Sequence, residues 1–138
     1  MGRILAIDYG KKRVGIAVTD TMQLIANGLT TVSVNEIYDF LSSYIAKEKV
    51  DKFVVGHPKT LRNEDSESMK YIKPFIKSLQ NKFPEIEVVL IDERFTSKIA
   101  FQTMIDAGLS KKHRKNKELI DTISATLILQ NYLNQNSI

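Results

Sequence analysis

Three acidic residues, far apart in the chain, are the side chains best suited to chemistry. Asp8 ends an apolar run, Glu93 follows another, and Asp121 is expected in the first turn of the last helix. Carboxylate oxygens are ligands that Mg²⁺ prefers, and two ions about 3.5–4 Å apart can activate a water and stabilise a leaving oxygen. If the carboxylates meet, the chemistry they favour is phosphodiester hydrolysis assisted by Mg²⁺ or Mn²⁺, with two ions.

Each acid also has a simple structural explanation. Asp8 can start the turn that follows it, because Asp and Gly favour turns. Glu93 can pair with Arg94, and Asp121 can be stabilised by the dipole of its helix. The hydrolytic interpretation therefore depends on whether the fold brings the three acids to one place.

Basic side chains in predicted loops form a second set suited to nucleic acid. Such charges attract a polyanionic backbone with an affinity that falls as salt rises, although a charged loop can simply face solvent. Neither basic segment is interleaved with aromatic residues, which favours backbone contacts over base stacking. His57 could also assist proton transfer. The candidates for nucleic-acid binding are Lys11, Lys12, Arg13, His57, Lys59, Arg94, Lys111, Lys112, Arg114 and Lys115.

The hydrophobic pattern predicts five strands and four helices to position these residues. Strands are expected at 3–7, 14–18, 24–34, 52–56 and 87–91, and helices at 37–45, 69–83, 96–108 and 117–132. Pro74 predicts either a kink in the second helix or a later start. The first link is short enough to require antiparallel strands, and the later strands follow helical crossovers. This order predicts an α/β, RNase H-like fold: a five-stranded mixed sheet in the order 3-2-1-4-5, with strand 2 antiparallel, flanked by helices.

That arrangement bears directly on the acids. Strands 1, 4 and 5 would be parallel, so their carboxyl ends would lie along one edge, where open α/β sheets form ligand crevices. Asp8, the loop at 56–58 and Glu93 would meet there. Asp121 would approach from the last helix. We therefore expect a shared acidic site drawn from distant segments.

Length and composition set outer limits. The 138 residues predict one domain over 1–138. The absence of cysteine excludes disulfides, thiolate catalysis and cysteine-ligated zinc. No apolar stretch is long enough to span a membrane and no signal segment precedes the first strand, so a cytoplasmic protein is expected. The net charge of +4 permits a polyanionic partner without requiring one.

The motifs around these residues resemble those of the YqgF/RuvX family of bacterial RNase H-like proteins. Segments 7–20, 55–58, 92–96 and 121–133 are similar to the family's opening motif, its G-x-P loop, its D-E-R-x-T motif and its closing helix, in the right order. The segment 59–64 departs from the family pattern, which often has an Asn and an Asp-Gly pair there. The resemblance implies a metal-dependent nuclease with Asp8, Glu93 and Asp121 as its acidic triad.

The resemblance also suggests a substrate. Members of the family are assigned to trimming of the 5′ end of the 16S ribosomal RNA precursor, and were earlier assigned as Holliday junction resolvases. We therefore favour structured RNA, with branched DNA second; a junction resolvase would need a symmetric dimer. Monomer and homodimer both stay open. A nucleic-acid-binding protein without catalysis is a further alternative, and half of a sugar-kinase or actin-like ATPase is disfavoured by the chain's length.

Overall fold

The computed structural model describes residues 2–57, 69–92 and 117–136, and within them five strands form one mixed sheet. The strands are β1 (Arg3–Tyr9), β2 (Arg13–Thr19), β3 (Ala26–Ser33), β4 (Val50–His57) and β5 (Glu87–Asp92). Their order is β3-β2-β1-β4-β5. β2 is antiparallel to both of its neighbours, whereas β1, β4 and β5 are parallel. The predicted sheet order and strand directions are confirmed.

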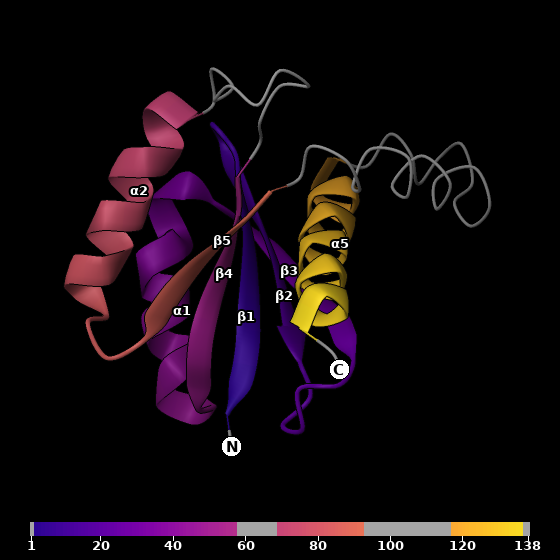
Figure 1. Cartoon of the computed structure of the whole chain (residues 1–138). Coiled ribbons are helices and arrows are strands. Elements are labelled where there is room, and N and C mark those ends of the chain that lie inside the picture. Colours follow the sequence, from indigo (N-terminus) through magenta and orange to yellow (C-terminus); the bar gives the residue numbers. More distant parts are fainter. Residues whose placement is uncertain (1, 58–68, 93–116, 137–138) are drawn as a thin grey trace.

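Helices cover both faces of this sheet (Figure 1). α1 (Ile37–Lys47), which follows the short 3₁₀ turn η1 (Val34–Glu36), and α2 (Met69–Lys82) lie on one face, and α5 (Lys117–Asn136) lies on the other. α2 begins at the first residue of its predicted stripe and continues through Pro74, so the later start is wrong. The helix predicted at 96–108 lies outside the described residues. No helix in the described ranges is long and apolar enough to cross a membrane.

The central strand β1 contributes to two hydrophobic cores because its side chains alternate between the faces. Leu5 and Ile7 pack with α1 and α2, whereas Ile4 and Ala6 pack with α5. All four are buried, as the continuous apolar run predicts for a strand covered on both sides. The next side chain on the α5 face is that of Asp8.

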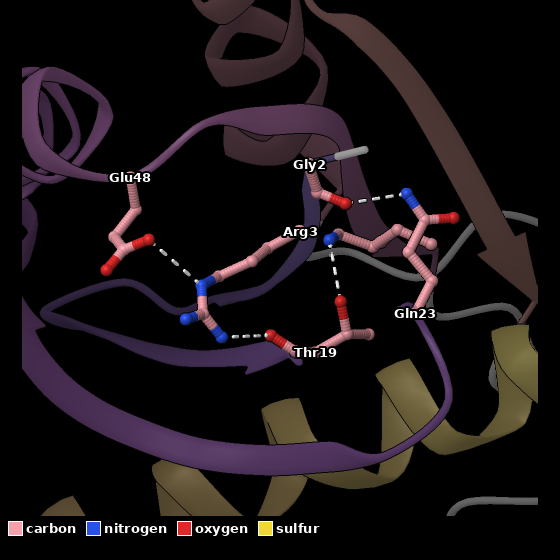
Figure 2. A network of polar contacts seen from close by, with 6 residues as sticks. Gly2, Arg3, Thr19, Gln23 and Glu48 are labelled. Carbon is pink, nitrogen blue, oxygen red and sulfur yellow. Dashed lines mark hydrogen bonds and ion pairs between the residues drawn. The ribbon is translucent and has the colours of Figure 1, made fainter. Parts of the chain in front are cut away.

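A network of polar contacts lies at the end of the sheet where β1 begins (Figure 2). Arg3 donates from Nε to Oε2 of Glu48 (3.3 Å) and from Nη1 to the backbone carbonyl of Thr19 (2.9 Å). Gln23, whose φ of 58° is left-handed, donates from Nε2 to the carbonyl of Gly2 (2.7 Å). These contacts join the β2–β3 loop and the end of α1 to the first strand.

Candidate active site

Asp8 lies at the carboxyl end of β1, on the face that α5 covers, in register with Gly15 of β2. Its carboxyl group is poorly solvated. Burial raises the pKa of Asp8 from 3.8 to about 6, and the negative charge of Asp121 contributes to the increase. The structure therefore brings two of the three predicted acids close enough for their charges to interact.

Glycine at position 15 allows α5 to approach the sheet closely. A Cβ atom on Gly15 would overlap the backbone carbonyl oxygen of Asp121. On the neighbouring strand, a Cβ on Gly28 would lie 2.7 Å from Cγ2 of Thr122. Both strands thus present a flat surface to the helix. Because Gly15 is opposite Asp8, this close approach places the backbone of Asp121 beside the first acid.

Threonine hydroxyls fasten the same part of α5 to β3. Oγ1 of Thr31 donates to the backbone carbonyl of Glu118 (2.7 Å) and lies within hydrogen-bond distance of Oγ1 of Thr122 (2.7 Å). Glu118 and Thr122 are one turn apart and flank Asp121. These hydrogen bonds therefore fix the position of the acid along the sheet.

Asp121 lies one turn further into its helix than the sequence predicts. α5 begins at Lys117, and the acid in its first turn is Glu118. Because the influence of the helix dipole fades within the first turn, the dipole does not account for Asp121. Its partner is instead Arg13, whose Nε donates to Oδ2 of Asp121 at 2.6 Å. The positive guanidinium partly offsets the repulsion between the two acids.

The turn that leads to Arg13 carries the first basic segment. The backbone N–H of Gly10 donates to the carbonyl of Arg13 (2.9 Å), which closes the turn between β1 and β2. Lys11 and Lys12 are both exposed in this turn. Two of the predicted backbone-binding residues thus face solvent next to the acids, whereas Arg13 is engaged with one of them.

Tyr9 is a contributor to the site that the sequence reasoning missed. Its ring stacks on Phe75 of α2, with centroids 4.0 Å apart and planes 13° apart. Burial, together with the nearby hydroxyls of Tyr38 and Tyr71, raises the pKa of Tyr9. Adjacent residues of a strand face opposite sides, so packing Tyr9 against α2 directs Asp8 toward α5. The sequence feature that could have indicated this role is an aromatic residue directly after the acid at the end of the strand.

The other predicted site residues are placed less completely. His57 is the last residue of β4, where its backbone is in register with Asp92, the last residue of β5. The parallel strands therefore place the backbones of His57 and Asp92 at the same end of the sheet as Asp8. The predicted site residues outside the described ranges are Lys59, Glu93, Arg94, Lys111, Lys112, Arg114 and Lys115.

The chemistry of the donor set fits a hard divalent cation. Within the described ranges no group of three or more acidic, histidine or cysteine side chains could hold a metal ion. Asp8 and Asp121 supply two carboxylates whose charges oppose each other, and a cation would neutralise that repulsion. Oxygen donors of this kind suit Mg²⁺ or Mn²⁺. The described residues thus contain two of the three predicted ligands.

Comparisons with known proteins cover almost the whole chain. A family model described as "RuvX: Holliday junction resolvase" matches residues 2–135. A protein of Bacteroides thetaiotaomicron is 59% identical over 133 residues, which is 96% of each chain. Proteins of Phocaeicola vulgatus and Flavobacterium johnsoniae are each 58% identical over the same share of both chains. All three relatives carry the name "Putative pre-16S rRNA nuclease".

Proposed function

The chain belongs to the RuvX family, and from this membership we propose that it is a metal-dependent nuclease that processes the 5′ end of the 16S ribosomal RNA precursor. The observation that carries the proposal is the meeting of Asp8 and Asp121 at the end of β1. A poorly solvated carboxyl group beside a second acid is costly to the fold. Such an arrangement is typical of a site built to bind a cation.

The residues that would hold the cations are Asp8, Asp121 and, one residue beyond β5, Glu93. Bound divalent ions supply Lewis-acid activation of a water and charge stabilisation at the leaving oxygen. Asp8 must lose its proton to become a ligand, which its pKa of about 6 permits at neutral pH. The contacts of α5 with β2 and β3 hold Asp121 at a fixed place relative to Asp8.

Basic side chains around the site would bind the RNA backbone. Lys11 and Lys12 are exposed next to Asp8, and the segment 111–115 precedes the helix that carries Asp121. Contacts of this kind position a substrate without reading its sequence. We therefore expect the folded structure of the precursor RNA, rather than its base sequence, to determine where the protein cleaves it. The proposed substrate assigns the activity to the cytoplasm.

The second candidate function is cleavage of four-way DNA junctions, which the description of the family model favours. The names of the relatives favour ribosomal RNA. A junction resolvase cuts two strands in register and so needs two sites related by symmetry. Substrate preference and oligomeric state therefore separate the two functions.

The test compares a 16S precursor transcript with a four-way DNA junction, each incubated with Mg²⁺, Mn²⁺ or EDTA. We expect cleavage of the RNA near its mature 5′ end, only with a divalent cation, and little cleavage of the junction. Preferential cleavage of the junction by a dimer would favour the resolvase. Tight binding of RNA without any cleavage would favour a binding protein.

Single substitutions of the acids test the mechanism. We expect Asp8→Asn, Glu93→Gln and Asp121→Asn each to lower the cleavage rate by about 100-fold or more while the protein stays folded. Glu85→Gln is the matched control, because Glu85 is an exposed acid between α2 and β5, and it should cleave normally. Folding is checked by thermal melting. Full activity in one acid variant would remove that residue from the proposed ligand set.

A further inference from the structure

Arg13 and Arg3 form the same kind of ion pair at opposite ends of the sheet's strands. They differ in whether their remaining N–H donors have partners. In each, Nε donates to a carboxylate: Oδ2 of Asp121 for Arg13 and Oε2 of Glu48 for Arg3. Arg3 also uses Nη1, which donates to the carbonyl of Thr19 (Figure 2). Nη1 and Nη2 of Arg13 have no partner among the described residues. Within the part of the chain that the structure describes, the guanidinium of Arg13 is therefore held through Nε, while its two terminal nitrogens have no partner.

The location of these free donors matches a phosphodiester. Arg13 begins β2 directly after the exposed Lys11 and Lys12, and its anchoring acid adjoins Asp8. The Arg13 side chain is 37% exposed, so an RNA backbone can reach it. Guanidinium groups bind phosphate through two parallel N–H donors. A side chain already held in place loses less conformational entropy on binding.

We propose that Asp121 orients Arg13 so that the terminal nitrogens of the guanidinium bind a backbone phosphate of the RNA. One carboxylate would then serve both the cation and the substrate, through different partners. The inference rests on the proposed function for the identity of the ligand. Its test is carried out in EDTA, where divalent cations do not contribute to binding.

Asp121 has two opposing effects on RNA binding, and the proposal fixes which is larger. As a negative charge, it repels phosphates. As the anchor of Arg13, it keeps the guanidinium pointing to one place. The Asp121 side chain is only 20% exposed and is paired at 2.6 Å, so an RNA at the surface experiences little of its charge. Removing the acid should therefore weaken the binding of a polyanion, which is the reverse of simple charge repulsion.

A double-mutant cycle measures this coupling. The affinity for a 16S precursor fragment is measured in EDTA for the natural protein, Arg13→Gln, Asp121→Ala and the double variant. We expect Arg13→Gln to weaken binding about tenfold and to lower the salt slope by about one phosphate contact. Asp121→Ala should weaken binding about threefold when Arg13 is present and not at all in the Arg13→Gln background.

Matched variants separate this role from general effects. Arg3→Gln breaks a similar ion pair at the opposite end of the strands and should leave RNA affinity unchanged. Arg13→Lys keeps the positive charge but lacks the planar group that can bind Asp121 and also offer two parallel N–H donors to a phosphate. Its RNA affinity should therefore lie between those of the natural protein and Arg13→Gln. Asp121→Asn repeats the test with a side chain of the same shape. Melting curves establish that each variant is folded.

Two results would overturn the inference. One is tighter RNA binding by Asp121→Ala in both backgrounds, which would mean that the acid acts only by repulsion. The other is an unchanged affinity and salt slope in Arg13→Gln. Either result leaves metal-dependent cleavage intact. Conversely, energetic coupling between Arg13 and Asp121 in a protein that cleaves no nucleic acid would refute the proposed nuclease and support the role of Asp121 in orienting Arg13.

Discussion

The carboxyl group of Asp8 controls how single residues of the site respond to pH. Its pKa is about 6 in the folded protein, because burial and the charge of Asp121 both disfavour ionisation, against 3.8 for an unperturbed group. The folded state therefore binds this proton more tightly than the unfolded chain does. The resulting stabilisation is complete below about pH 4 and is lost as the pH rises through about 6.

We therefore expect Asp8→Asn to be more stable than the natural protein at pH 7 in EDTA, by about 3 kcal/mol. The two proteins should have similar free energies of unfolding near pH 3, where Asp8 is mostly neutral in both states. Urea denaturation at several pH values measures the difference. An equal stability difference at pH 3 and pH 7 would mean that Asp8 does not titrate in this range.

Asp20 supplies a control of opposite sign. Its exposed carboxylate accepts hydrogen bonds from the backbone N–H groups of Ile25 (2.9 Å) and Leu24 (2.8 Å), which lower its pKa. A lowered pKa stabilises the fold above the unfolded value, and this contribution is lost as the pH falls. Asp20→Asn should therefore be less stable than the natural protein at neutral pH, and this difference in the free energy of unfolding should shrink as the pH falls through the acidic range.

At the level of elements, the contact between α5 and β2 determines whether the two acids meet. Gly15 faces backbone atoms of Asp121, which cannot move aside without displacing the helix, whereas Gly28 faces the methyl group of Thr122. Neither glycine has a positive φ, so a substitution tests packing rather than backbone strain.

We expect Gly15→Ala to lower the free energy of unfolding by about 3 kcal/mol and to reduce cleavage strongly, because α5 must shift. Gly28→Ala, in the adjacent strand, should lower the stability by only about 1 kcal/mol and largely preserve cleavage. Denaturation and cleavage rates are measured on both variants. Equal losses in the two would mean that the close approach at Gly15 has no special role.

The elements could be predicted from the sequence to the extent that local patterns encode them. The apolar run of β1 indicated burial on both faces, and the short first turn fixed the direction of β2; both are confirmed. The pairing of Arg13 with Asp121 joins residues 108 positions apart, and no local period encodes such a contact. The start of the last helix at Lys117 agrees with the predicted range, and Asp121 lies in its second turn because it is the fifth residue from that start.

For the whole molecule, the placement of charge matters more than its amount. A net charge of +4 is mild, so nonspecific attraction of RNA is weak unless basic residues gather near the site. The proposed cluster includes Lys111, Lys112 and Arg114. Exposed lysines in other parts of the chain are Lys47 in α1, Lys49 between α1 and β4, and Lys77 in α2.

Neutralising Lys111, Lys112 and Arg114 together with Gln should weaken RNA binding and lower the slope of log affinity against log salt by roughly two to three contacts. The control converts Lys47, Lys49 and Lys77 to Gln, which changes the net charge equally at a distance from the site. It should leave the slope almost unchanged. A similar loss in both triple variants would indicate attraction by overall charge alone.

Because β1 is buried on both faces, the alternation of its side chains determines whether Asp8 reaches the site. Inserting or deleting one residue between Ile4 and Asp8 would turn the carboxyl group toward α2 and the ring of Tyr9 toward α5, because successive side chains alternate. Both partners would then be mismatched at once. Changes in length can be absorbed in the turn at 10–12 but not within the strand itself.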